Sequence, residues 1–414
     1  MWRDFIRRKV AGALGFGKKG SLLEELLLRG TQTAAGVHVS PDSAMRIATV
    51  FSCVGVLAET VAQLPIRIYR KTATAREEVR DHPLWRLLAT APNSWQTSFE
   101  FREMMMQHLC LRGNFYALKV FDNKGIVREL LPLNPDCVSV KQNPDWSITY
   151  TVTDSKAGYL HYGNGEILHV RYRTLDGVTG ISPVAYNRET FGMAIAEIRH
   201  GANLYRNGGK PGGVLEHPGQ LSKEAHERLK ASWEHDYGGM NAGKTAVLEE
   251  GMSYKPLTMT QADAQYIETR QLTIEEIARI YRVPLHEIQS TRKSTTWGSG
   301  IEAMNIGFTT RTILPWLRRI EEAEVRDLLP PGDRENIQIK YIVEGLLRGD
   351  KKTRYEVYGI GIDKGLLCPN EVRALEDMNP REGGDTYLTP LNMRESGSLG
   401  GEDPGDEEPD ETDD

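Results

Sequence analysis

The stretch SPVAYNRETFGMAIAEIRHGANLYRNGG, residues 182–209, decides the fold. Ser182 is suited to cap a helix, and Pro183 is suited to its first position. Two glycines interrupt the pattern at the other end. Between these limits, apolar residues recur at helical spacing, at Val184, Phe191, Ile195, Ile198, Ala202 and Tyr205. The stretch therefore predicts a long helix over 182–207 that carries a single apolar stripe.

A second long helix of the same character is predicted over 262–284, where Pro284 ends it. Its apolar residues share one side of the helix: Ile267, Ile274, Ile277 and Tyr281. Two helices with one stripe each, separated by a small insert, cannot form a self-contained bundle. Copies of the same chain can cover the stripes, and a cyclic head-to-tail ring does so without an open end. The pattern therefore favours a ring-forming oligomer.

The insert between these helices, residues 208–261, predicts a small α/β segment. Ser222 is placed to cap a short helix. The apolar residues of that helix recur at four-residue intervals, at Leu221, Ala225, Leu229, Trp233 and Tyr237. A glycine-rich turn follows, and a strand is predicted over 245–249. The order of elements is therefore helix, glycine-rich turn, strand.

The glycine-rich turn matches the nucleotide-binding pattern GxxxxGK[ST] letter for letter, through Gly238, Gly243, Lys244 and Thr245. In that pattern a strand delivers the loop, and a following helix points its N-terminal dipole at the phosphates. Here the helix precedes the loop and the strand follows it. We therefore interpret the match as a glycine-rich connection and expect no ATPase.

The polar stretch LHEIQSTRKSTTWGSG, residues 285–300, predicts an irregular loop. A helix is predicted over 301–328, and Pro315 inside it should kink the helix because proline removes one backbone hydrogen bond. Alternating apolar residues then predict a strand over 337–343. Two short helices complete the ordered part, near 350–360 and 369–378.

Residues 40–175 predict an α+β domain. Helices are expected over 40–65 and 98–112, with a strand over 65–71 between them. Strands are then expected over 114–121, 126–133, 137–141, 146–152, 159–162 and 166–172. The first two of these flank a turn and predict a hairpin. The last two are joined by Gly163-Asn164-Gly165, a sequence typical of a tight hairpin turn.

No group of residues indicates catalysis or metal binding. His161 and His169, on strands expected to be adjacent, are interpreted as hydrogen-bonded sheet residues, and Glu321 and Glu322 as surface carboxylates. Four cysteines lie far apart without a CxxC pair, and we expect buried thiols in a reducing compartment. These are Cys53, Cys110, Cys137 and Cys368. No catalytic residue, metal or cofactor is therefore predicted.

Charge is distributed unevenly along the chain. Residues 1–39 form a basic arm, and residues 391–414 form an acidic tail that is expected to be disordered. The net charge is −6, and the segment 395–414 alone carries ten acidic and no basic residues, which leaves +4 for residues 1–394. So weak a positive charge does not favour tight binding of nucleic acid. No apolar run is long enough to cross a membrane.

Several separated segments carry a more specific signal. They include ATVFSCVGVLAETVAQLPIRIYR, GNFYALKVFDNKGIVRELLPLNPDCV, GEILHVRYRTLDGVTGISPV, YRNGGKPGGVLEHPGQLS, TTWGSGIEAMNIGFTTRTILPWLRRIE and GLLRGDKKTRYEVYGIGIDKG. Together and in this order, over about 48–385, they resemble the portal proteins of long-tailed double-stranded-DNA bacteriophages. One departure is Cys368, which stands where portals often have a hydroxyl residue that caps the next helix.

The resemblance implies a portal fold assembled as a cyclic ring, a homo-oligomer and specifically a dodecamer, in the virion. Double-stranded DNA would be packaged and ejected through the ring without sequence specificity. The implied parts are an α+β wing (40–181), stem helices (182–207 and 262–284), a small α/β clip (208–261), a tunnel loop (285–300), a kinked helix and strand that return to the wing (301–344) and a helical crown (345–390).

The resemblance also implies where partners bind. The terminase large subunit and the head–tail adaptor would dock on the clip, through Trp233, Tyr237 and Lys244. The major capsid or scaffold protein is a further partner, and no membrane is involved. The tunnel loop would offer shallow contacts to DNA through Gln289, Arg292, Lys293, Ser294, Thr295 and Thr296. The alternatives are a P-loop NTPase of the packaging machinery, and another head–tail connector or minor capsid protein.

Overall fold

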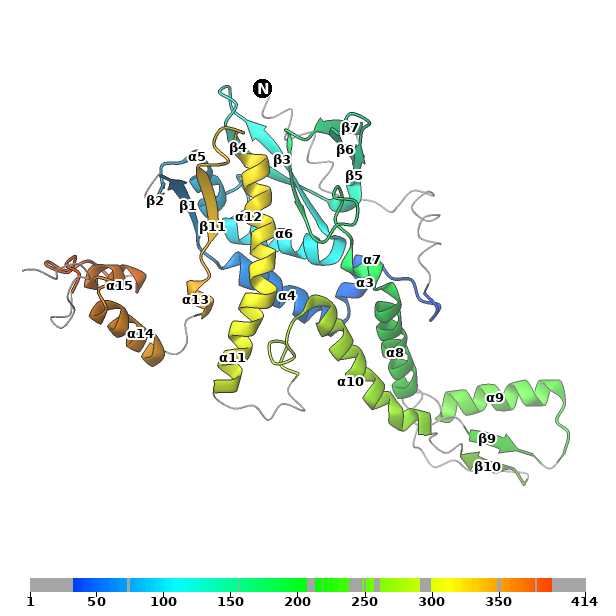
Figure 1. Cartoon of the computed structure of the whole chain (residues 1–414). Coiled ribbons are helices and arrows are strands. Elements are labelled where there is room, and N and C mark those ends of the chain that lie inside the picture. Colours follow the sequence, from blue (N-terminus) through cyan, green and yellow to red (C-terminus); the bar gives the residue numbers. More distant parts are fainter. Residues whose placement is uncertain are drawn as a thin grey trace, which may run out of the picture. The chain divides into compact units, whose positions relative to one another are not determined.

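A computed structural model describes the chain over residues 33–72, 75–155, 157–206, 213–217, 219–237, 248, 251–256, 261–290, 299–347, 351–376 and 378–388. The chain divides into two compact units, and the division falls between Val343 and Glu344. The first unit combines helices with antiparallel sheets, and the described part of the second is helical (Figure 1). The predicted combination of α and β structure is confirmed.

The helices of the first unit are α3 (Pro41–Met45), α4 (Ala48–Ala62), α5 (Pro83–Trp85), α6 (Ser98–Arg112), α7 (Pro183–Tyr186), α8 (Arg188–Arg206), α9 (Lys223–Tyr237), α10 (Gln261–Tyr281), α11 (Ser299–Phe308) and α12 (Leu314–Leu328). Its strands are β1 (Ile66–Lys71), β2 (Arg76–Glu78), β3 (Asn114–Phe121), β4 (Val127–Leu133), β5 (Val138–Gln142), β6 (Ile148–Asp154), β7 (Gly158–Gly163), β8 (Ile167–Arg171), β9 (Gly213–Glu216), β10 (Ser253–Pro256) and β11 (Ile337–Tyr341). Short turns of π-helix span Arg86–Thr90 and Thr309–Ile313, and a 3-10 turn spans Pro135–Cys137.

The described strands form sheets in the orders β11-β1-β2, β4-β3-β8, β5-β6-β7 and β10-β9. The first of these joins distant parts of the sequence, because Ile339 of β11 lies opposite Ile68 of β1. The chain that leaves this region before α8 therefore returns to it after α12. We call the described residues of 33–181 and 299–343 the body.

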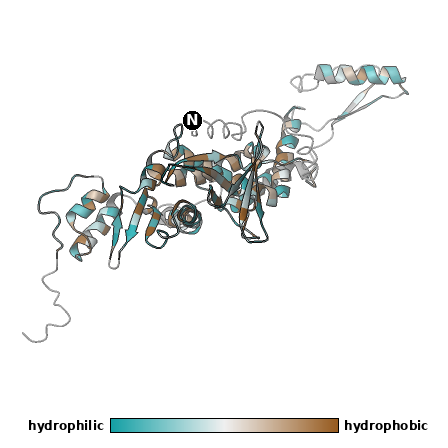
Figure 2. Cartoon of the chain, turned by 90° about the horizontal axis from the view of Figure 1, so that it is seen from above, coloured by the Kyte–Doolittle hydropathy of each residue, from teal (hydrophilic) through white to brown (hydrophobic). Residues whose placement is uncertain are grey.

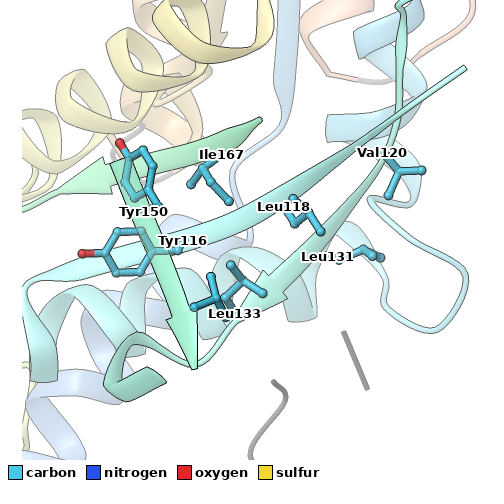
Figure 3. Packing of buried hydrophobic residues seen from close by; sticks show 8 residues of the cluster. Tyr116, Leu118, Val120, Leu131, Leu133, Tyr150 and Ile167 are labelled. Atoms are coloured by element: carbon cyan, nitrogen blue, oxygen red, sulfur yellow. The ribbon is translucent and has the colours of Figure 1, made fainter. Parts of the chain in front are cut away.

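One hydrophobic cluster joins the sheets β4-β3-β8 and β5-β6-β7 (Figure 3). The Tyr116 and Tyr150 rings meet edge to face, with centroids 6.0 Å apart. The buried members are Tyr116, Leu118, Val120, Leu131, Leu133, Tyr150, Val152 and Ile167. Because these residues alternate along the strands, one face of each sheet is apolar and the two faces pack together.

Helix α6 has sharply defined ends. Thr97 accepts a hydrogen bond from the Glu100 N–H at 3.2 Å, while the Glu100 carboxylate accepts one from the Thr97 N–H at 2.8 Å. This reciprocal capping satisfies two donors that the helix itself leaves free. Gly113 ends the helix in the left-handed conformation with φ 74°, and β3 begins at the next residue. The prediction of a helix over 98–112 is confirmed.

Helix α12 packs across strands of two sheets, β8 and β11. Each of these is an edge strand whose outer N–H groups have no strand partner. The Glu321 carboxylate accepts the N–H of Tyr341 at 3.1 Å, and the Asp327 carboxylate accepts the N–H of His169 at 3.0 Å. Acidic side chains of one helix thus cap two sheet edges and hold the sheets together.

The interpretation of Glu321 as a surface carboxylate is therefore wrong. It is 5% exposed and also accepts a hydrogen bond from Lys340 Nζ at 2.7 Å, whereas its neighbour Glu322 is exposed. Helical periodicity explains the difference, because Glu321, Glu324 and Leu328 share the inner face of α12. A pair of adjacent glutamates suggests a solvated run, but only one of the two can face the solvent here.

Glu324 is a buried carboxyl from which we expect the stability of the body to depend on pH. It is 1% exposed, and burial raises the pKa of this carboxyl to about 8, although the Tyr341 hydroxyl donates to it at 2.8 Å. A carboxyl with a raised pKa stabilises the fold below its ordinary pKa, and that stability is lost as the pH rises through the raised value. We expect the melting temperature to fall between about pH 5 and pH 8. We expect Glu324→Gln to flatten this dependence, as measured by thermal unfolding across that range.

The matched control is Glu322→Gln, which removes a carboxylate from the outer face of the same helix. It should leave the pH profile unchanged. A Glu324→Gln profile that still falls as steeply as that of the unaltered protein would show that another group causes the pH dependence.

The predicted pairing of the last two strands is wrong. Gly163-Asn164-Gly165 does join β7 to β8, but β7 pairs with β6, and β8 pairs with β3. His161 and His169 therefore lie in different sheets. Each is hydrogen bonded, His161 to Thr151 Oγ1 at 3.0 Å and His169 to Tyr150 at 3.2 Å. Their interpretation as hydrogen-bonded sheet residues is confirmed.

Two helices predicted as continuous are each interrupted once. Asn187 separates α7 from α8, and its side-chain amide donates to the Pro183 carbonyl at 2.9 Å, in competition with the helix backbone. Ser40 caps α3 as expected, but Ile47 is extended and α4 begins after it. The C-terminal boundaries before Pro65 and near Gly208 agree with the prediction.

The second unit contains α13 (Glu344–Leu347), α14 (Lys351–Asp363) and α15 (Pro369–Leu375). A charged link joins the last two, because Arg354 donates to the Glu376 carboxylate at 2.8 Å. The helix after Cys368 is capped without a hydroxyl side chain, since the Glu371 carboxylate accepts the Cys368 N–H at 2.8 Å. Apolar side chains of α14 and of the connection to α15 are uncovered in this unit, with Val357, Ile360 and Leu366 more than half exposed.

Candidate functional site

The two longest helices in the described part of the chain, α8 and α10, run side by side (Figure 1). At their body end the rings of Phe191 and Tyr281 meet edge to face, with centroids 6.5 Å apart. Further along, Thr273 Oγ1 donates to Glu197 Oε1 at 2.8 Å. The helices are therefore joined by both apolar and polar contacts.

The apolar stripe of α8 is covered only in part. Phe191 is fully buried and Ile195 is half-buried, but Ile198 is 45% exposed. On α10 the pattern is the same, since Ile277 is buried while Leu272 is 53% exposed. Each helix thus has uncovered apolar surface at a distance from the body, as expected for helices that pack against further copies.

The connection after α10 begins as a compact turn. The Gln289 N–H donates to the His286 carbonyl at 3.1 Å, and Ser290 N–H donates to the Leu285 carbonyl at 2.9 Å. His286 Nε2 is hydrogen bonded to Asn305 Oδ1 of α11 at 2.9 Å. The turn is therefore held against the helix to which the chain returns.

Of the residues predicted to contact DNA, only Gln289 lies within the described residues. It is exposed and takes the left-handed conformation, with φ 57°. The others lie outside the described residues: Arg292, Lys293, Ser294, Thr295 and Thr296. They stand in the sequence between Ser290, the last residue of the described turn, and Ser299, where α11 begins.

The segment between α8 and α10 contains α9 and the antiparallel pair β9-β10, in which Leu215 lies opposite Tyr254. Neither strand was predicted, and the strand predicted over 245–249 lies almost entirely outside the described residues. Hydrophilic and hydrophobic residues alternate along α9 (Figure 2), and Leu229 and Trp233 are half-buried among exposed neighbours. The helix therefore offers a narrow apolar strip on a polar surface.

The other residues predicted to bind partners are described only in part. Tyr237 is the last residue of α9, and its side chain lies outside the described residues, as does Lys244. Helix α9 ends at Tyr237, directly before the glycine-rich sequence that begins at Gly238. The helix therefore precedes this sequence, as predicted, whereas the glycine-rich sequence itself lies outside the described residues.

Within the part of the chain that the structure describes, no three His, Cys, Asp or Glu residues are grouped to hold a metal ion. No helix among the same residues has the length and apolar character of a membrane span. The thiols of Cys53 and Cys110 are buried, and burial raises the pKa of Cys53 to about 12. Such thiols are protonated at neutral pH and do not act as nucleophiles.

Comparison with known proteins identifies similar sequences. The family described as "Phage portal protein" matches residues 48–377. The chain is 32% identical over 382 residues to the "Probable portal protein" of Streptomyces phage phiC31, which covers 89% of this chain and 83% of that protein. It is 31% identical over 353 residues to the "Portal protein" of Enterobacteria phage HK97, which covers 84% of this chain and 83% of that protein.

Solved structures show the same fold. A chain in the virion of a native gene transfer agent particle superposes with a TM-score of 0.57 at 24% identity, covering 87% of this chain and all of that one. An HK97-family phage portal protein from Corynebacterium diphtheriae superposes with a TM-score of 0.55 at 19% identity, covering 77% of this chain and 97% of that one. From the family match, the long alignments and this shared fold, we conclude that the chain belongs to the phage portal protein family.

Proposed function

We propose that this chain assembles into a ring, a dodecamer, around a channel at one vertex of a viral capsid. Double-stranded DNA passes through the channel when the capsid is filled and again when it is emptied. Membership of the portal family supports this function. The structural observation that carries it is the uncovered apolar surface of α8 and α10 in the single subunit. The ring itself needs no catalytic residue.

The assembly faces follow from the exposed apolar side chains. Ile198 of α8 and Leu272 of α10 are 45% and 53% exposed, although the ends of the same helices next to the body are buried. Burying such side chains between subunits stabilises an oligomer by roughly 25 cal/mol per Å² of apolar surface. In a closed ring every subunit contributes the same face and its complement, so no copy remains with an exposed stripe.

The DNA contacts are assigned to the loop 285–300, which connects the stem to the body. Its basic residues are Arg292 and Lys293. They stand beside hydroxyl and amide side chains that can touch phosphates without reading bases. Each phosphate contact adds a strongly salt-dependent attraction, so many of them would hold the duplex still. The charge of +4 on residues 1–394 fits a duplex that slides.

The remaining partners are assigned by region. The clip, residues 208–261, is the proposed docking site of the terminase large subunit and later of the head–tail adaptor. Trp233 lies on the apolar strip of α9. Tyr237 and Lys244 follow it in the sequence and add an aromatic and a cationic residue to the proposed docking segment. The wing (40–181) and the crown (345–390) are the proposed contacts with the major capsid or scaffold protein.

The double substitution Arg292→Ala and Lys293→Ala tests the loop. We expect the rings to form normally, since the proposed assembly faces lie on α8 and α10 and not on this loop. Loss of two phosphate contacts should lower retention of packaged DNA roughly tenfold at physiological salt. Ring formation is checked by negative-stain microscopy, and DNA retention by the nuclease-resistant DNA in particles.

The control exchanges the two residues, Arg292→Lys with Lys293→Arg, which keeps both charges. It should retain DNA like the unaltered protein. Normal retention by rings that lack both charges would contradict the placement of the loop in the channel. A purified protein that stays monomeric at high concentration, or that hydrolyses ATP rapidly, would contradict the portal function itself.

A further inference from the structure

Helix α10 ends in a geometry that normally contains glycine. The Arg282 N–H donates to the Arg279 carbonyl at 3.2 Å, and the Val283 N–H donates to the Ala278 carbonyl at 3.0 Å. This pair of bonds defines a helix end in which the residue after the last helical one is left-handed. That residue is Arg282, with φ 59°. A side chain with a Cβ is strained in this conformation, and glycine is not.

The sequence explains why the helix must end here but not why arginine ends it. Pro284 keeps the preceding residue, Val283, out of the helical conformation, so α10 cannot continue. Val283 is 3% exposed and Ala278 is also 3% exposed, as the apolar contact of such a helix end requires. All of these features would be served at least as well by a glycine at position 282.

The neighbouring segment between α11 and α12 explains the arginine. Pro315 has no N–H, so the carbonyl of Arg311, four residues earlier, has no helical partner. The backbone responds with a π-helical turn over Thr309–Ile313, in which the Leu314 N–H donates to Thr309 instead. The Arg282 guanidinium donates through Nη2 to the Arg311 carbonyl. The side chain that strains the end of α10 thus satisfies the acceptor that Pro315 leaves free.

A second hydrogen bond joins the end of α10 to the π-helical turn, and here the π-helical turn supplies the donor. Thr312 Oγ1 donates to the Arg282 carbonyl at 3.0 Å, and Thr312 is itself 5% exposed. The bond between His286 and Asn305 at 2.9 Å adds a link about two turns earlier, in α11. Residue 282 therefore contributes both its side chain and its backbone to one contact.

We propose that Arg282 is a positioning residue, which fixes the start of the loop 285–300 to the π-helical turn between α11 and α12. The contact joins the end of the stem helix to the body, so that the loop leaves from a fixed point. This inference rests on the proposed function for its purpose, because the loop is assigned to the channel. The contact itself is independent of that function.

The test compares Arg282→Gly with Arg282→Lys in purified rings, using hydrogen exchange. Glycine relieves the backbone strain but removes the donor, whereas lysine keeps a donor and the strain. We expect amide exchange at Val283, Gln289, Ser290 and Leu314 to rise about fivefold in Arg282→Gly. Arg282→Lys should be closer to the unaltered protein. Unchanged exchange in Arg282→Gly would show that Arg282 only ends a helix, and equal acceleration in both variants would show that its donor is not used.

Pro315→Ala provides a coupled control, because alanine returns an N–H to the Arg311 carbonyl. In that background Arg282→Gly should accelerate exchange less than it does alone. An equal effect in both backgrounds would show that this carbonyl is not the acceptor that matters.

DNA retention by the same rings separates this inference from the proposed function. Retention that falls in Arg282→Gly and recovers in Arg282→Lys supports both. Faster exchange with normal retention would leave the positioning role in place and contradict the assignment of the loop to the channel.

Discussion

Replacing Gly113 with alanine is expected to prevent stable folding of the body. Gly113 has φ 74°, a conformation that costs an alanine about 1 kcal/mol. The larger effect is steric, because an alanine Cβ would lie 2.1 Å from the carbonyl oxygen of Ile181 and 2.9 Å from the nitrogen of Ser182. Both are backbone atoms and cannot rotate away. Gly113→Ala should lower the free energy of unfolding by more than about 3 kcal/mol, which is a large part of the stability of a typical domain.

The close approach at Gly113 has a structural purpose. Here the segment that leads into α7 passes the end of α6, and Asn114 hydrogen bonds to both the N–H and the carbonyl of Gly180, each at 2.7 Å. Ser182, which caps α7, also donates to the Leu111 carbonyl at 2.7 Å. The same contacts therefore fix the point from which α8 starts, so the substitution should also disturb the ring.

The matched control is Gly125→Ala. Gly125 has almost the same backbone conformation, φ 75°, but no atom lies within 4 Å of the position of the added Cβ. The Gly125→Ala variant should lose only about 1 kcal/mol of folding stability. Soluble yield and thermal unfolding at one fixed protein concentration measure the difference, since the melting temperature of an oligomer depends on concentration. Equal losses in the two variants would contradict the steric argument.

Sequence reasoning succeeded where the signal is local. The helix predicted over 98–112 and the strand predicted over 114–121 agree with α6 and β3. Their bounds depend on local chemistry, since Thr97 and Glu100 cap the helix and Gly113 ends it. The long helices were recognised from their spacing and from Pro284. Family membership was recognised from the order of several segments, and the comparisons confirm it.

It failed where the outcome depends on distant partners. Nothing near Gly163 shows that β8 pairs with β3 and not with the strand just before it, because sheet partners are chosen by the packing of whole faces. The burial of Glu321 depends on which strands α12 covers. Arg282 was taken as part of a helix, although its place two residues before Pro284 was a signal that could have identified it. The charged residues of the loop at Arg292 and Lys293 remain a prediction.

Replacing Ile198 with aspartate is expected to dissociate the ring and to leave the subunit folded. Ile198 is 45% exposed in the single chain, so the fold of the subunit loses little when this side chain is changed. In the proposed ring we expect the same position to face a neighbouring copy, where an unpaired carboxylate must be desolvated at a cost of several kcal/mol. The cost recurs at every interface, and a ring that cannot close at one interface remains open.

The control for this experiment is Asn203→Asp, which adds the same charge to the same helix. Asn203 is exposed, and five residues along a helix place it about 140° around the axis from Ile198. Sedimentation should therefore show single subunits for Ile198→Asp and rings for Asn203→Asp, with the same circular dichroism and similar unfolding. Intact rings of Ile198→Asp would exclude this stripe from the interface. Dissociation by both variants would mean that the charge of the helix, and not its apolar face, controls assembly.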